Sequence, residues 1–385
     1  MNRIGVIGAG AMGSGIAQVA AMSGCEVMVY DSNSLSIIKS RDSILSSLNK
    51  LAARGKITDV ESKAIFGRLY FADRLESIAG SHLIIEAIVE SLEEKRNLFY
   101  KIKPLVHPDT IVASNTSSFS ITLLARETSH PQHFIGLHFF NPPVLMPLVE
   151  IIPALQTSPN LVPKMADLMK QWEKMPVIAK DTPGFIVNRI ARPFYGEALR
   201  IAEEQLATPA EIDAAMKTFG GFRMGPFELM DFIGQDVNYA VTHSVWTSMY
   251  YDARYKPSPL QASMVNAGWL GRKTGRGFYH YAEASEPANG KAPDAHKFIF
   301  DRILAMLINE AADAVYLGIA SRPDIETAMT LGVNYPKGLL QWADELGIVN
   351  CVQQLDSLYS MYNEDRYRCS RLLREMAQAR QTFFA

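Results

Sequence analysis

Apolar residues in the first half of the chain fall alternately into short runs and into helix-spaced positions. The short runs have the length of buried strands and lie at Arg3–Ile7, Glu26–Tyr30, Leu83–Ile85 and Ile111–Ala113. Helical patterns lie between them, at Ala11–Ser23, from Asp31 to about Arg54 and at Ser91–Ile102. Strands that alternate with helices predict an α/β domain with a mostly parallel, doubly wound sheet.

The pattern changes after Asp181–Phe185, where strand signals largely vanish and helical periodicity takes over. Pro183–Gly184 is therefore the predicted domain boundary. Beyond it the chain repeats itself, because the segment from Arg189 aligns with the segment from Arg302 at a constant shift of 113 positions. The shift places Glu197 on Glu310, and it predicts two copies of one all-α module.

The predicted organisation has four parts. Residues 1–183 form the α/β domain, 184–282 the first helical copy, 283–294 a linker rich in Pro, Ala and charge, and 295–385 the second helical copy. The second copy is degenerate, since it has no counterpart of Gly271–Tyr279 and places Asp301 where the first copy has Asn188. We therefore expect the second copy to be structural.

Composition excludes several classes of protein. Of 385 residues, 48% are hydrophobic and 20% charged, which is ordinary for a globular protein. A net charge of -2 argues against nucleic acid and anionic membranes as partners. Three scattered cysteines support neither a disulfide framework nor a metal site. The N-terminus enters a strand directly and no apolar run could span a bilayer, so we expect a soluble, cytoplasmic protein.

A glycine motif lies between the first strand and the first helix. Its glycines would permit a tight turn (Gly8), close approach of a pyrophosphate (Gly10) and close helix packing (Gly13), with Ala11 and Met12 at the start of the helix. The helix N-terminus would offer free N–H groups to phosphates. Asp31 ends the next strand and can bind both ribose hydroxyls, which favours NAD over NADP. A glycine turn without a ligand and a flavin site are the alternatives.

His138 and Glu150 form a candidate catalytic pair. His138 lies in the aromatic, strand-like segment His133–Pro143, and Glu150 is the one carboxylate of a second apolar strand. A strand–turn–strand hairpin can bring the two side chains together. A histidine held by a carboxylate has a fixed tautomer and raised basicity, as a base for an alcohol proton requires. A buried structural histidine beside an edge charge is the alternative.

The chain resembles the L-3-hydroxyacyl-CoA dehydrogenases. The resemblance rests on motifs in the family's order: GAGAMGSGIA, EAIVESLEEK, SNTSS, GLHFFNPP, VEII, DTPGFIVNR and MGPFELMDFIG. It covers about Arg3 to Tyr281, and the repeat extends it nearly to the C-terminus. The duplicated helical module resembles the longer 3-hydroxybutyryl-CoA dehydrogenases. Phe222–Arg223 departs from the family, which more often has a proline before Met-Gly-Pro.

The resemblance implies roles for individual residues. His138 matches the catalytic base and Glu150 its partner, while Ser117 and Asn188 match residues beside the reacting group. NAD contacts are implied for Glu90, Lys95, Asn115 and Ser117. Without the family, Ser117 reads as a loop cap and Lys95 as a solvated helix charge.

A basic group near the end of the helix after Asp31 is a candidate for binding the phosphates of coenzyme A. It comprises Lys50, Arg54 and Lys56, and Lys50 and Arg54 share one face of the helix. Ser47 and Arg54 also align with family positions that contact coenzyme A. The alternative is a solvated helix end whose cations interact with the helix dipole.

The expected function is NAD-dependent oxidation of a (3S)-3-hydroxyacyl-CoA of short chain, such as 3-hydroxybutyryl-CoA, in fatty-acid or aromatic-acid degradation. Two alternatives stay open: an L-gulonate-type dehydrogenase resembling lambda-crystallin, and a non-catalytic crystallin-like protein. The helical domain forms the dimer interface in single-copy relatives. We therefore expect either a homodimer through that domain or a monomer whose two copies form an intrachain pseudo-dimer.

Overall fold

The computed structural model describes residues 1–281 and 292–384, which divide into two compact units, Met1–Phe185 and Ile186–Ala385. Most of the predicted linker 283–294 lies outside the described residues, as do positions 282 and 385. In the described part of the chain, no helix is both long enough and apolar enough to cross a membrane.

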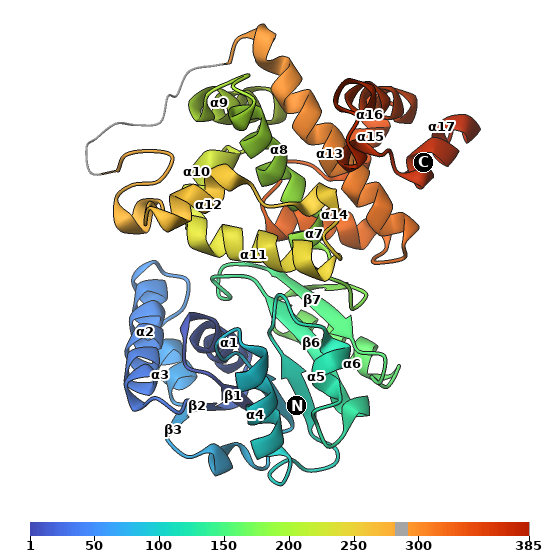
Figure 1. Cartoon of the computed structure of the whole chain (residues 1–385). Helices are drawn as coiled ribbons and strands as arrows, with labels where there is room; N and C mark the ends of the chain where they lie inside the picture. The colour runs from blue at the N-terminus through green and yellow to red at the C-terminus, as the bar shows by residue number, and fades with distance from the viewer. Residues whose placement is uncertain (282–291, 385) are drawn as a thin grey trace. The chain divides into compact units, whose positions relative to one another are not determined.

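The first unit is built on one eight-stranded sheet in the order β3-β2-β1-β4-β5-β6-β7-β8 (Figure 1). Its strands are β1 Arg3–Ile7, β2 Glu26–Tyr30, β3 Leu69–Ala72, β4 Leu83–Glu86, β5 Ile111–Ser114, β6 Phe134–Phe139, β7 Leu148–Pro153 and β8 Met175–Ile178. Every neighbouring pair is parallel except β6 and β7. The predicted α/β doubly wound fold is confirmed.

Six α-helices accompany the sheet: α1 Ala11–Met22, α2 Ser34–Ala53, α3 Asp59–Phe66, α4 Leu92–Ile102, α5 Ile121–Ala125 and α6 Leu161–Gln171. The small residues of α1 let it pack closely, and Ala17, Ala20 and Ala21 are fully buried in the core beside β1 and β2. Helix α3 begins at a capping box, in which Thr58 and Glu61 satisfy each other's backbone N–H groups.

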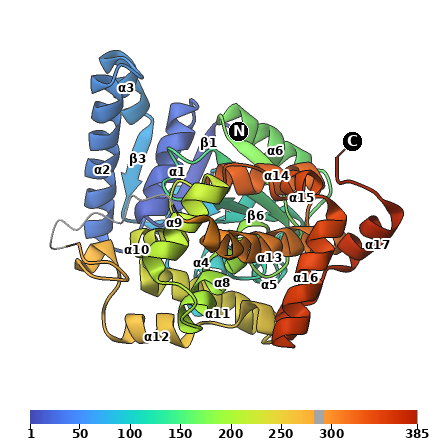
Figure 2. The ribbon, with the colours of Figure 1, turned by 90° about the horizontal axis from the view of Figure 1, so that it is seen from above.

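The second unit is helical among its described residues. The first copy holds α7 Val187–Ile190, α8 Arg192–Glu203, α9 Pro209–Gly220, α10 Pro226–Ile233, α11 Gln235–Ser248 and α12 Pro259–Asn266, and the second holds α13 Lys297–Tyr316, α14 Arg322–Gly332, α15 Leu339–Leu346, α16 Ile348–Tyr362 and α17 Arg371–Ala379. Helix α13, orange in Figures 1 and 2, lies against α8 and α9 of the first copy. The two predicted helical repeats are thus packed on each other.

The end of the second copy corrects part of one expectation, namely that no residues there correspond to Gly271–Tyr279. In the first copy, the Asp231 carboxylate accepts the N–H groups of Phe278 and Tyr279 at 3.1 and 3.0 Å. In the second copy, Asp344 accepts those of Phe383 and Phe384 at 2.8 and 2.9 Å. The second copy therefore does have a counterpart of the Phe278–Tyr279 segment. Sequence alignment misses it because the connection from α16 to Phe383 differs from the first copy in length.

Candidate active site

The carboxyl ends of the central parallel strands gather most of the predicted site residues. The glycine loop follows β1, Asp31 follows β2, Glu90 follows β4 and Ser117 follows β5, while His138 is the penultimate residue of β6. Since β2, β1, β4, β5 and β6 are consecutive neighbours in the sheet, these residues share one edge. Open α/β sheets bind their ligands at this edge, beside the point where the strand order reverses.

The glycine loop has the geometry of a dinucleotide cradle. Gly8 has a φ of +107°, and a Cβ there would lie 2.4 Å from the carbonyl oxygen of Ala87. A Cβ on Gly13 would lie 1.8 Å from the carbonyl oxygen of Gly8. At Gly10, by contrast, a Cβ would meet nothing within 4 Å. The loop is closely packed on its protein side and open at Gly10, so these residues fit a bound pyrophosphate.

The N-terminus of α1 completes the cradle. Gly10 is the N-cap and provides no side-chain cap, so the first N–H groups of the helix, beginning at Ala11 and Met12, are offered to a ligand. Asp31 is fixed from two sides, because its carboxylate accepts the N–H groups of Ala9 at 2.7 Å and Asn33 at 2.9 Å. Its negative charge suits ribose hydroxyls and opposes a 2′-phosphate.

A buried cluster of charges lies between the ends of β4 and β5. The Lys95 ammonium on α4 is 2.6 Å from Glu86 and 3.1 Å from Glu90. Glu86, which the sequence did not single out, is fully buried and also accepts the Ser114 hydroxyl at 2.5 Å. Lys95 is itself only 1% exposed. Its charge is therefore neutralised by two carboxylates within the protein.

Glu90 connects this cluster to the loop after β5. One carboxylate oxygen accepts the Thr116 hydroxyl at 2.5 Å, the Ser118 hydroxyl at 2.7 Å and the Ser117 N–H at 3.1 Å. Burial alone would raise the pKa of Glu90, but Lys95 and the two hydroxyls lower it below its ordinary value. Glu90 thus stays ionised and holds the Ser117 loop in place.

Asn115 holds the same loop to the next strand, because its side-chain carbonyl accepts the Phe139 N–H at 2.8 Å. The Ser117 hydroxyl has no hydrogen-bond partner among the described residues. It is half-buried and remains able to bind a ligand.

His138 and Glu150 face each other across β6 and β7. The antiparallel register pairs the two residues directly, and Nδ1 of His138 lies 2.6 Å from a carboxylate oxygen of Glu150. Glu150 is fully buried, and the imidazole ring lies 4.6 Å from the ring of Phe140 and 5.9 Å from that of Phe185. A carboxylate at Nδ1 assigns the proton to that nitrogen, which leaves the lone pair on Nε2.

Asn188 belongs to the second unit, on the short helix α7. It is half-buried, and its backbone carbonyl accepts the Nε–H of Arg192 at 2.9 Å. Asp301, its counterpart in the second copy, instead pairs with Lys297 at 2.5 Å.

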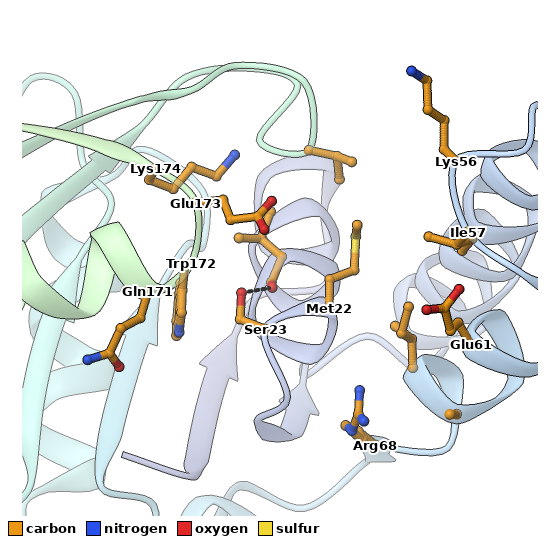
Figure 3. Close-up of a pocket in the computed structure, with 14 residues that line it drawn as sticks. Met22, Ser23, Lys56, Ile57, Glu61, Arg68, Gln171, Trp172, Glu173 and Lys174 are labelled. Carbon is orange, nitrogen blue, oxygen red and sulfur yellow. Dashed lines mark hydrogen bonds between the residues drawn. The ribbon is translucent and has the colours of Figure 1, made fainter.

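The basic group divides between α2 and the turn after it. Ser47 and Lys50 lie on α2, and Arg54 is its C-cap, so the three share one side of the helix. Lys56 follows the turn at Gly55 and lines a different place, a pocket of about 520 Å³ between α1, α3 and the segment Gln171–Lys174 (Figure 3). The structure therefore does not gather the four residues at one point.

Two family matches cover nearly the whole chain. The NAD-binding domain of 3-hydroxyacyl-CoA dehydrogenase matches residues 3–182, and the C-terminal domain of the same enzyme matches 184–281 and again 298–382. The chain belongs to the 3-hydroxyacyl-CoA dehydrogenase family. It is accordingly an NAD-dependent oxidoreductase that acts on CoA-linked substrates.

Some relatives in this family match nearly the whole chain, and others match about three quarters of it. The 3-hydroxyadipyl-CoA dehydrogenase of Escherichia coli K12 is 36% identical over 98% of each chain. The crystal structure of a 3-hydroxybutyryl-CoA dehydrogenase from Escherichia coli K12 superposes with a TM-score of 0.93, at 36% identity over 98% of each chain. The 3-hydroxybutyryl-CoA dehydrogenase of Bradyrhizobium diazoefficiens is 39% identical over 74% of this chain and 97% of its own.

Proposed function

We propose that this 3-hydroxyacyl-CoA dehydrogenase oxidises short-chain (3S)-3-hydroxyacyl-CoA, with 3-hydroxybutyryl-CoA as a reference substrate, and that His138 and Glu150 are its general base and partner. The observation that carries the proposal is the 2.6 Å contact between Nδ1 of His138 and Glu150. It leaves Nε2 basic and directed away from the carboxylate.

The geometry supports a separate role for each of the two side chains. Nε2 of His138 removes the proton from the C3 hydroxyl, and the buried Glu150 carboxylate stabilises the imidazolium that forms. NAD, when bound, supplies the acceptor for the hydride that leaves C3. The product is the 3-oxoacyl thioester, and His138 then returns its proton to solvent.

Supporting residues position the reactants in this proposal. The glycine loop, Ala11, Met12 and Asp31 bind NAD, while Glu90 orients the Ser117 loop beside the nicotinamide. Asn188 contacts the substrate. Lys95 acts indirectly, since its ammonium is enclosed by Glu86 and Glu90. Ser47, Lys50 and Arg54 bind coenzyme A from one side of α2, and Lys56 extends the basic surface beyond the turn.

One assay separates this proposal from its alternatives. NADH oxidation is measured with acetoacetyl-CoA, with longer 3-oxoacyl-CoA and with free acetoacetate. We expect turnover of the thioesters and at least about a hundredfold lower efficiency on the free acid, because coenzyme A provides much of the binding energy. Activity confined to free acids would instead support the L-gulonate-type alternative. The crystallin-like alternative requires no turnover at all, and membership of a dehydrogenase family argues against it.

We further propose that the protein is a cytoplasmic monomer whose two helical copies replace a dimer interface. Ion pairs between the copies support this: Arg189 of the first copy is 2.6 Å from Glu310 of the second, and Arg302 of the second is 3.0 Å from Glu197 of the first. Light scattering of the purified protein tests the proposal. A mass near 42.7 kDa is expected, and a mass twice as large would show a homodimer.

A further inference from the structure

The turn between β6 and β7 connects the two strands that carry the candidate catalytic pair. It runs through residues 140–147, and three of these are prolines, which have no N–H group to donate. The N–H groups of Leu145 and Met146 both donate to one carbonyl, that of Pro142, at 3.0 Å. The turn therefore has few donors of its own with which to fix its position against the rest of the first unit.

Lys174 supplies donors from outside the turn. Its Nζ donates to the carbonyl of Pro143 at 2.5 Å and to that of Met146 at 3.0 Å. The side chain comes from the segment between α6 and β8, and it lies along one wall of the pocket in Figure 3. A hydrogen bond from an ammonium is stronger than one from a neutral donor, so Lys174 holds both carbonyls firmly.

Lys174 is a buried cation, with 8% of its surface exposed. Burial lowers its pKa, and the charge of the adjacent, exposed Glu173 carboxylate partly opposes this effect. Lys95, which is also buried, lies beside two carboxylates, whereas the Lys174 ammonium is bound by two backbone carbonyls. An apolar side chain of similar size would avoid the cost of burying a charge. The two hydrogen bonds of Lys174 therefore point to a role other than stability.

The other side of the turn packs on α1. A Cβ on Gly15 would lie 2.6 Å from Cδ of Pro143, so the proline ring contacts the helix where a glycine leaves room for it. Helix α1 begins at the glycine loop, where its first N–H groups are offered to a pyrophosphate. Pro143 is thus held between the Lys174 ammonium and the helix that binds the cofactor.

The position of the turn also affects His138, since the turn begins two residues after it. Phe140, the first residue of the turn, places its ring 4.6 Å from the imidazole. A displacement of the turn away from α1 would move Phe140, and the imidazole packed on it, relative to the glycine loop. A misplacement of about 1 Å at a reacting group can lower a rate by about 10²-fold. All of these residues belong to the first unit.

We propose that Lys174 is a positioning residue for the reaction: it holds the β6–β7 turn against α1 and thereby fixes the place of His138 relative to the bound nicotinamide. The inference rests on the proposed function, in which His138 is the general base. Lys174 contacts neither substrate nor cofactor in this proposal, and it affects the rate of proton and hydride transfer through His138.

The test is a double-mutant cycle between Lys174 and His138, measured as the single-turnover rate of NADH formation from 3-hydroxybutyryl-CoA and NAD. Lys174→Met removes the donor and should lower this rate by about 10- to 100-fold. Its KM and its Kd for NADH should stay within about threefold of wild type, because the lysine contacts neither ligand. In the His138→Ala background the same substitution should change the rate by less than about threefold, since the position of the turn no longer matters once the base is removed.

Two other variants complete the cycle. Lys170→Met, at an exposed lysine near the end of α6, is the matched control and should have the wild-type rate. Lys174→Arg keeps a cation at the same place and should recover part of the rate that Lys174→Met loses.

Gly15→Ala tests the same relationship from the opposite side of the turn and decides the matter if Lys174→Met does not fold. Its Cβ would displace Pro143 from α1 while Lys174 stays in place, so the rate should again fall, and the fall should again depend on His138. A wild-type rate in Gly15→Ala would show that the position of the turn does not control the base.

The remaining outcomes separate this inference from the proposed function. Equal losses from Lys174→Met with and without His138 would overturn the inference and assign Lys174 to folding. An unchanged rate in Lys174→Met, together with a large loss in His138→Ala, would overturn it while leaving the proposed function intact. Full turnover by His138→Ala would remove the proposed base and the inference together.

Discussion

Glu197 and Glu310 occupy equivalent positions in the two helical copies, and each carboxylate is bound by arginines of the other copy. Arg302 and Arg366 approach Glu197 at 3.0 and 3.9 Å, and Arg189 and Arg254 approach Glu310 at 2.6 and 3.0 Å. Both carboxylates are fully buried. The contact between the copies therefore contains two reciprocal charge clusters, one around each glutamate.

Glu310→Gln should strongly destabilise the helical unit. The substitution leaves Arg189 and Arg254 buried without their shared carboxylate, which should lower the free energy of unfolding by about 3–5 kcal/mol at pH 7. Urea denaturation followed by circular dichroism measures the change. Glu375→Gln, which removes an exposed pair with Arg371, is the control and should have little effect.

The charge cluster around Glu310 predicts that the stability of the protein depends on pH. Burial alone would raise the pKa of Glu310, but Arg189, Arg254 and the Tyr255 hydroxyl lower it below its ordinary value. A lowered pKa in the folded state gives stability that is complete above the unfolded value of about 4.3 and is lost as pH falls through the folded value. The difference between wild type and Glu310→Gln should therefore shrink below about pH 4.3. A difference that grows on acidification would contradict this assignment.

His138→Ala should lower kcat by at least about 10²-fold, the smallest effect typical of a general base. Its affinity for NAD should not change, because the imidazole contacts Glu150 and aromatic rings rather than the glycine loop. Steady-state kinetics and fluorescence titration with NADH measure the two quantities. His107→Ala, at an exposed histidine, serves as the control. Full turnover by the His138 variant would remove His138 from the mechanism.

Gly10→Ala should weaken cofactor binding without affecting the stability of the fold. A Cβ there meets no protein atom within 4 Å and φ is -72°, so the Tm should stay within about 1 °C of wild type. The same methyl would enter the space assigned to the pyrophosphate, and the Kd for NADH should rise at least about tenfold. Gly67→Ala, also at negative φ, is the matched control. An unchanged Kd would mean that NAD does not approach the loop at Gly10.

Lys95→Met tests whether this lysine contacts NAD directly or acts through Glu90. The variant leaves Glu86 fully buried without its cation, so the protein without cofactor should lose about 3–5 kcal/mol of stability. Lys101→Met, at an exposed position of the same helix, should not. A variant with unchanged stability and weaker NAD binding would instead support a direct contact.

The short apolar runs predict strands that lie inside the sheet, with a neighbour on each side. The runs at β1, β2, β4 and β5 are almost wholly apolar, and the structure has strands at each of them. Strands β3 and β8 were not predicted, because each has four residues, lies at an edge of the sheet and has at most one fully buried position. Short edge strands carry little apolar pattern, and only their pairing with a neighbour defines them.

The site was predictable where residues lie close in the sequence or follow a strand. His138 and Glu150 belong to one hairpin, and the glycine loop and Asp31 follow adjacent strands. Glu86 was missed for a different reason. A charged residue at the end of an apolar strand is common, and only burial beside Lys95 and Ser114 distinguishes Glu86.

Two helical copies in one chain can differ in a way that two identical subunits cannot. In a symmetric dimer every substitution occurs twice, so a residue introduced in one subunit also appears at the equivalent position of the other. Here Asn188 is not duplicated, because Asp301 fills the equivalent position of the second copy and pairs with Lys297. Joining the copies in one chain therefore lets equivalent positions differ while both copies keep the reciprocal ion pairs at Glu197 and Glu310.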